Sequence, residues 1–167
     1  MYIILLLNIL FNYQVLSNNL IIGDSQVISV YSNTKNLNID TRLHRVGWGI
    51  NDLINAVRRH PVNKSVDRVF ICVGTNDGYK TTVGISTLSL LLDYKFPNAK
   101  KYVIVGSYGW GINRFVKYED VNNYYNTFNI YSIIRLKNEI GYSKTHPNHN
   151  TPTIINIGSE IDVITNE

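Results

Sequence analysis

The chain has 167 residues, of which 44% are hydrophobic and 17% are charged, and its formal net charge is +4. This length predicts one domain with a single core, and this composition argues against intrinsic disorder and against a coiled coil. The basic residues are spread along the sequence without a dense run. They indicate weak attraction to acidic partners and argue against a nucleic-acid-binding protein.

The single cysteine, Cys72, lies inside an apolar run. We therefore expect a buried structural thiol and no disulfide within the chain. The four histidines are not accompanied by a cysteine cluster, so the sequence predicts no zinc site. We expect the protein to work without a metal or an organic cofactor.

Residues 1–17 differ in character from the rest of the chain. Residues 2–11 are almost wholly apolar, but the stretch is too short to cross a membrane. Together with the small residue Ser17 it resembles a secretory signal peptide, although the positively charged start is missing. The alternative is an extra strand or helix packed on the domain. We place the domain at residues 18–167, expect no stable membrane insertion beyond this signal or anchor, and favour secretion over a cytoplasmic location.

The first half of the domain alternates between apolar runs and helical patterns. Asn19–Ile22 is a short apolar run typical of a buried strand, and Gln26–Tyr31 after it predicts a helix. A weaker second strand is predicted at either 37–39 or 42–46. Ile50–Arg59 predicts a helix, because its apolar residues recur at helical spacing and a proline follows shortly after its end.

The second half continues this alternation. Arg68–Val73 is a continuous apolar run of the kind found inside parallel sheets, and Tyr102–Val105 predicts the next buried strand. The predicted helices cover Val83–Leu92, the long Asn- and Tyr-rich stretch Tyr118–Asn138, and Pro152–Ile164. Thr151 would cap the last of them. Strands that alternate with helices predict a three-layer α/β/α sandwich around a mostly parallel sheet of about five strands.

Three short polar motifs carry the chemistry: Gly23-Asp24-Ser25, Gly74-Thr75-Asn76-Asp77 and His146-Pro147-Asn148. The first two each follow a predicted strand, so we expect them at the carboxyl ends of parallel strands, where open α/β sheets build their sites. A serine, an amide and a histidine at one sheet edge can serve as nucleophile, oxyanion donor and general base. This combination points to acyl transfer.

The motifs, in this order, resemble the SGNH hydrolase superfamily of GDSL-like esterases and lipases. The stretch Gly47-Trp48-Gly49-Ile50-Asn51-Asp52-Leu53 is similar to a further block of that family, so four blocks span nearly the whole domain. The resemblance implies a flavodoxin-like fold, a nucleophile at Ser25 and a general base at His146.

The same resemblance implies an oxyanion hole. Its donors would be the backbone N–H groups of Ser25 and Gly47 and the side-chain amide of Asn76, with Gly49 as the fallback for Gly47. Loss of one such donor typically lowers the rate by roughly 100- to 1000-fold. Fixed placement of these donors therefore matters more than the basicity of the general base.

One position departs from the family pattern. The family places an aspartate three residues before the histidine, and here that residue is Ser143. Loss of this carboxylate costs on the order of 10⁴-fold in kcat in another serine hydrolase, because the imidazole loses its orientation. Three explanations stay open: a Ser–His pair oriented by Ser143 or a backbone carbonyl, a carboxylate from Glu139 or Asp77, or a domain that kept the fold and lost efficient chemistry.

Residues beside the motifs allow two interpretations each. Ser25 could simply cap the helix after it, and Asp24 is predicted to brace the turn rather than to react. The aromatic residues Trp48, Tyr108 and Trp110 lie in predicted loops. They would line an acyl or sugar pocket together with Asp24 and Asp77, or they would pack the loops.

We interpret the chain as a serine esterase that forms an acyl-serine intermediate. The chain is short and offers no long insertion for a lid or a deep acyl tunnel, which favours short acyl groups such as acetyl esters, for example on carbohydrate. The first rival is a binding module that recognises a glycan or an acylated ligand, and the second is a structural scaffold. The oligomeric state is left open.

Overall fold

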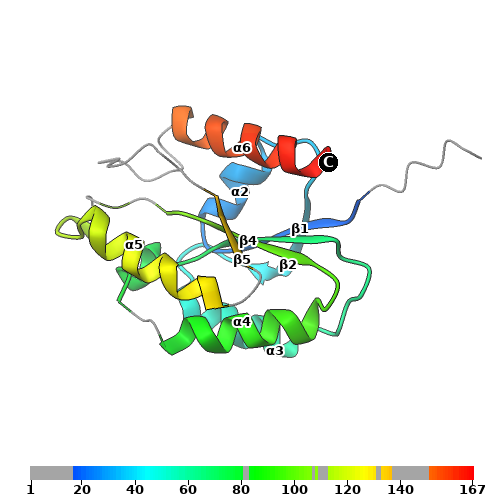
Figure 1. Ribbon diagram of the computed structural model, residues 1–167, viewed down its shortest axis with the longest axis horizontal. Coiled ribbons are helices and arrows are strands. Elements are labelled where there is room, and N and C mark those ends of the chain that lie inside the picture. Colours follow the sequence, from blue (N-terminus) through cyan, green and yellow to red (C-terminus); the bar gives the residue numbers. More distant parts are fainter. Residues whose placement is uncertain (1–16, 81–82, 107, 109–112, 131–132, 137–150) are drawn as a thin grey trace, which may run out of the picture.

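The computed structural model describes residues 17–80, 83–106, 108, 113–130, 133–136 and 151–167. Figure 1 shows a three-layer arrangement, with a central sheet between two layers of helices. The α/β/α fold class predicted from the sequence is therefore confirmed. Residues 1–16 lie outside the described residues, so the signal peptide and the domain boundary after it stay predictions.

Among the described residues the sheet contains five strands, and every pairing between them is parallel. The strands are β1 (Asn19–Gly23), β2 (Asn38–His44), β3 (Arg68–Cys72), β4 (Lys100–Ile104) and β5 (Ile133–Leu136). Their order in space is β2-β1-β3-β4-β5, the flavodoxin-like order. The direction of winding reverses between β1 and β3, so a crevice is expected beyond the carboxyl ends of these two strands.

Helices cover both faces of the sheet. They are α2 (Gln26–Tyr31), α3 (Ile50–Arg59), α4 (Val83–Lys95), α5 (Tyr118–Asn126) and α6 (Thr151–Thr165), with the short 3₁₀ helices η1 (Thr75–Asp77) and η3 (Thr127–Ile130). In Figure 1, α2 and α6 lie on one side of the sheet and α3 and α4 on the other. Within the described ranges, none of the helices has the length and apolar character needed to cross a bilayer.

Two sequence predictions about these elements are wrong. The long helix predicted over Tyr118–Asn138 ends at Asn126, and the chain continues as η3 and then as strand β5. The apolar spacing that predicts one helix includes Ile133 and Leu136, and both residues lie in a strand paired with β4, which local spacing does not reveal. Thr151, predicted as a cap, already lies in the first turn of α6.

The position of the second strand also differs from the prediction. The sequence offered residues 37–39 and 42–46 as alternatives, and β2 runs through most of both. It lies at the edge of the sheet and has only Leu43 fully buried, which explains its weak apolar signal. By contrast, the predicted helix Ile50–Arg59 matches α3 from end to end.

Alternating residues of the strands feed two apolar clusters. Ile22 and Ile71 belong to the cluster under α3 and α4, whereas Ile21, Phe70 and Cys72 belong to the cluster under α2 and α6. The expected burial of the Cys72 side chain is confirmed, and this burial raises the pKa of its thiol well above the usual value. The cysteine is thus a core residue.

Gly23 fixes the approach of β1 to β3. It pairs with Cys72 and has a φ of +130°, and a Cβ at this position would overlap the Cys72 carbonyl oxygen. The next residue, Asp24, donates its N–H to that same oxygen at 3.0 Å. Only glycine allows this contact, and the contact sets the Asp24-Ser25 turn directly against the end of β3.

We predict that Gly23→Ala lowers the free energy of unfolding by about 3 kcal/mol or more, because backbone strain adds to overpacking against β3. Gly47 provides the control: its φ is +83°, but a Cβ there meets no atom within 4 Å. Gly47→Ala should cost only about 1 kcal/mol, from strain alone. Urea denaturation of both variants tests this difference, and equal losses would contradict the close packing at Gly23.

Candidate active site

Three loops that follow β1, β2 and β3 are joined to one another by hydrogen bonds. The Arg45 N–H donates to the Gly23 carbonyl at 3.0 Å and ties the β2 loop to the end of β1. Gln26 Nε2 donates to Thr75 Oγ1 at 2.7 Å and ties the β1 loop to the β3 loop. Asn76 Nδ2 donates to the Trp48 carbonyl at 2.9 Å and ties the β3 loop to the β2 loop, so the three contacts form a closed circuit of hydrogen bonds. The first three sequence blocks therefore meet at one end of the sheet.

Ser25 occupies the position just before helix α2 and is half-buried. Its side chain makes no capping hydrogen bond to this helix. The alternative in which its hydroxyl serves as a helix cap is therefore wrong. The position of Ser25 follows from the Gly23 turn before it and from α2 after it, so its backbone is held on both sides.

Asp24 is buried beneath this turn and braces it, as the sequence predicts. One carboxylate oxygen, Oδ1, accepts the Gln26 N–H at 2.9 Å, and Oδ2 accepts Gln26 Nε2 at 3.4 Å. Burial, which disfavours the charged form, raises the Asp24 pKa from 3.8 to about 7 in spite of these hydrogen bonds. Asp24 thus changes charge near neutral pH, directly under Ser25.

Two of the predicted oxyanion donors have N–H groups to spare. The Gly47 N–H is exposed and has no partner among the described residues. An asparagine amide carries two N–H bonds, and Asn76 uses one of them on Trp48. The fallback, Gly49, already donates its N–H to Asp52 Oδ2 at 3.0 Å. This arrangement favours Gly47 over Gly49 as a donor.

Asp77 clamps the β3 loop onto α3. Its Oδ2 accepts the N–H of Ile50 at 2.8 Å, and a side chain on Gly49 would collide with its carboxylate. The group is half-buried, and desolvation raises its pKa. This contact gives Asp77 a structural role at the first turn of α3. If Asp77 also served as the substitute acid for His146, the same carboxylate would have to fill both roles.

A set of hydroxyl contacts below the loops is not predictable from the sequence motifs. The Tyr125 hydroxyl donates to the Val73 carbonyl at 2.8 Å and accepts the Gly106 N–H at 2.8 Å, so it joins the ends of β3 and β4. Thr75 Oγ1 lies 3.2 Å from the Tyr79 hydroxyl. The only signal for these contacts in the sequence is the richness of the α5 region in tyrosine.

The remaining predicted site residues divide into two groups. Trp48 is half-buried and packs against the core beside α3. Tyr108 is buried, with its ring 6.4 Å from that of Tyr118. Ser143, His146, Trp110 and the alternative acid Glu139 lie outside the described residues. Within the part that is described, no group of His, Cys, Asp or Glu side chains is arranged to hold a metal ion.

Comparison with known proteins gives the fold a context. Neither a protein-family model nor a curated protein sequence matches the chain. A GDSL-like lipase from Bacteroides thetaiotaomicron superposes with a TM-score of 0.64 at 14% identity, over 90% of this chain and 88% of the other. For a G-D-S-L family lipolytic protein from Veillonella parvula the TM-score is 0.58 at 14% identity, over 88% and 98%.

A third solved structure, a family two carbohydrate esterase from Clostridium thermocellum, superposes with a TM-score of 0.51 at 14% identity, over 90% of this chain and 64% of the other. At such identities a likeness establishes the fold. The chain therefore has the fold of the GDSL-like hydrolases, as the motifs predict.

We predict that Asp24 makes the protein less stable as the pH rises from 3.8 to about 7. In this range the unfolded chain has lost the proton and the folded chain retains it, so ionisation favours the unfolded state. The substitution Asp24→Asn removes this pH-dependent contribution to the free energy of unfolding. The stability of the variant relative to wild type should rise across this range by on the order of a few kcal/mol.

Urea denaturation between pH 4.5 and 8 measures this difference. The raised pKa of Asp77 contributes a slope of the same sign, but it is present in both proteins and cancels in the comparison. Parallel pH profiles for wild type and Asp24→Asn would contradict the prediction.

Proposed function

We propose that the protein is a serine ester hydrolase that acts through an acyl-serine intermediate. The nucleophile is Ser25 and the general base is His146. The observation that carries the proposal is the circuit of hydrogen bonds that joins the loops after β1, β2 and β3. It gathers a serine and two spare N–H donors at the sheet edge where α/β proteins build their sites.

The reaction has two halves. His146 accepts the proton of Ser25 as Oγ attacks the acyl carbon, and it returns that proton to the departing alcohol. A water molecule, activated by the same imidazole, then attacks the acyl-serine and releases the carboxylic acid. In each half the negative oxygen of the tetrahedral intermediate accepts hydrogen bonds from the N–H groups of Ser25 and Gly47 and from Asn76 Nδ2.

The orientation of His146 is the open step of this mechanism, because Ser143 stands where the resembled family has an aspartate. Ser143 or a backbone carbonyl would hold the imidazole in its productive tautomer, and a more distant carboxylate is the other option. If none of them does so, the protein is a binding module with the same pocket. Labelling by a serine-reactive probe separates an active esterase from such a binding module.

For the substrate, we propose a short acyl group, such as acetyl, carried on a carbohydrate. One structure that shares the fold is a carbohydrate esterase, and another is a GDSL-like lipase. Fold alone does not decide between these substrates, so the acyl length and the carbohydrate are both part of the proposal.

A fluorophosphonate probe, which forms a covalent bond with an activated serine, tests the proposal without knowledge of the natural ester. We predict labelling of wild type and of Ser32→Ala but not of Ser25→Ala, with hydrolysis of p-nitrophenyl acetate lost in parallel. Ser32 is a suitable control because it is exposed and its hydroxyl is bonded to the Ile28 carbonyl. Wild type that is not labelled, or equal labelling of Ser25→Ala, would reject the esterase.

We predict that Asn76→Ala lowers kcat by roughly 100- to 1000-fold with little change in KM, since the lost donor acts on the transition state. Asn113→Ala is the control for loop tethering, because Asn113 is buried and donates to the Thr75 carbonyl at 2.8 Å. This control should lower stability but reduce kcat far less. Equal losses of kcat in the two variants would show that Asn76 only positions the loop.

A further inference from the structure

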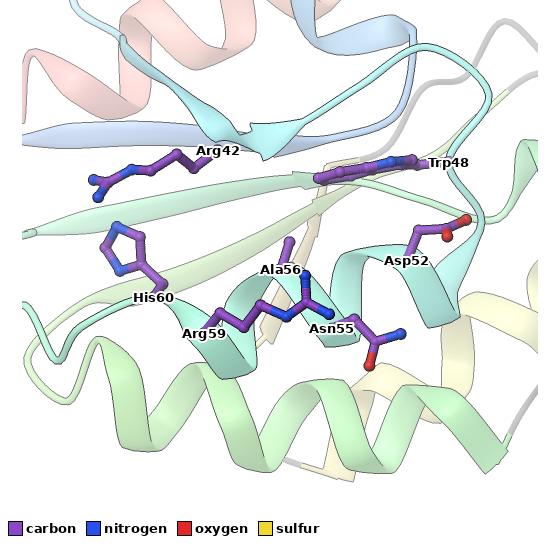
Figure 2. A pocket seen from close by; sticks show the side chains of 7 residues that line it. All are labelled: Arg42, Trp48, Asp52, Asn55, Ala56, Arg59 and His60. Carbon is purple, nitrogen blue, oxygen red and sulfur yellow. The ribbon is translucent and has the colours of Figure 1, made fainter.

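An open pocket of about 450 Å³ lies between α3 and the β2 edge of the sheet (Figure 2). This volume falls within the range of roughly 300–1,000 Å³ typical of small-molecule sites. Four of its lining residues share one face of α3, at helical positions i, i+3, i+4 and i+7. The full lining consists of Arg42, Trp48, Asp52, Asn55, Ala56, Arg59 and His60.

Trp48 forms an aromatic wall of this pocket. The indole is half-buried and packs against the core cluster, so core contacts hold it in place. Figure 2 shows the ring edge-on above α3, with one face turned across the pocket toward Ala56. The small side chain of Ala56 leaves space between helix and ring. A flat, amphipathic aromatic face of this kind suits the apolar C–H face of a sugar ring.

Some polar atoms around Trp48 already form hydrogen bonds within the protein, and others are available to a ligand. Arg42 forms a bidentate ion pair with Asp40, in which Nη2 lies 2.6 Å from Oδ2 and Nε lies 3.0 Å from Oδ1. Asp52 uses Oδ2 on the Gly49 N–H, which leaves Oδ1 as an acceptor. Asn55 accepts a hydrogen bond from Arg58 through Oδ1, and its amide N–H groups remain as donors. These groups could bind hydroxyls.

Arg59 is the cation in this pocket without a counterion. It is exposed, and in the described part of the chain it makes neither a hydrogen bond nor an ion pair. Arg42 adds a second guanidinium, although Asp40 offsets its charge. A guanidinium presents paired N–H donors that match carboxylate and phosphate oxygens. The pocket therefore combines an aromatic face suited to a sugar ring with a guanidinium that has no ion-pair partner among the described residues, at the end of α3 opposite to the Asp52 carboxylate.

Trp48 also connects the pocket to the proposed oxyanion hole. Its ring lines the pocket, and its carbonyl holds Asn76. We propose that the pocket binds a sugar residue that carries a negatively charged substituent, and that this residue belongs to the carbohydrate part of the ester substrate. The assignment to the substrate rests on the proposed function, whereas the binding of an acidic sugar to the pocket does not.

Calorimetric titration of the full chain carrying Ser25→Ala, in low salt, tests the binding without turnover. The probes are digalacturonate, the neutral galactobiose, galactose 6-phosphate and adenosine monophosphate. We expect digalacturonate or galactose 6-phosphate to bind about tenfold or more tightly than galactobiose, because a charge-assisted pair forms with Arg59. Whichever of the two binds identifies the anion as carboxylate or phosphate. Equal binding of galactobiose, no binding of either acidic sugar, or tighter binding of the nucleotide would overturn the proposal.

Two further measurements locate the bound sugar. Arg59→Gln should remove the preference for the acidic sugar, whereas Lys64→Gln, which removes an equal charge at an exposed loop position, should retain it. Equal effects of both variants would show attraction to the overall charge and reject the site. In Trp110→Phe, Trp48 is the sole tryptophan, and we expect the acidic sugar to shift its fluorescence. An unchanged spectrum at saturation would also reject the site.

The result of this experiment is separable from that of the esterase test. An acidic sugar that binds through Arg59 to a protein that fluorophosphonate does not label would sustain the binding site and reject the esterase. Labelling of Ser25 without binding of any acidic sugar would sustain the esterase and reject the pocket as a sugar site.

Discussion

The contact of Gly23 with Cys72 is the constraint on which the proposed site depends. It allows β1 and β3 to approach so closely that Asp24 donates its N–H to the last residue of the neighbouring strand. The strand order reverses at this pair, so the loops beyond it open onto a crevice. The serine turn and the asparagine turn then lie side by side, and one glutamine side chain can span them.

The layer beneath these loops is polar and nearly all buried. Asp24, Gln26, Thr75 and the hydroxyls of Tyr79 and Tyr125 form contacts with one another or with the strand ends. Buried polar groups that have partners hold a single geometry, because a shift of one group leaves others unsatisfied at a cost of about 1–3 kcal/mol each. Apart from Gln26 Oε1, which has no partner among the described residues, these contacts hold the serine and asparagine turns in place, as electrostatic stabilisation of a developing oxyanion requires.

Much of this architecture could be predicted from the sequence, and the failures have physical causes. The buried strands and α3 carry strong apolar patterns, and Gly23-Asp24-Ser25 follows a strand as the short motif predicts. Residues 133–136 are predicted as helix because local spacing contains no information about the pairing with β4 that makes them a strand. The hydrogen bonds from Gln26 and Tyr125 join residues far apart in the chain, and single-residue patterns do not predict such contacts. The same holds for the pocket at Trp48, which forms only when β2 lies beside α3.

The burial of Cys72 has a practical consequence. It is the only thiol in the chain, and it sits at the end of β3 between β1 and β4 with no exposed surface. A soluble alkylating reagent can reach this sulfur only when α2 and α6 move away from the sheet or the domain unfolds, and burial keeps it in the unreactive thiol form until then. The rate of alkylation therefore measures how often this face of the sheet becomes exposed, and it does so independently of any chemistry at the serine turn.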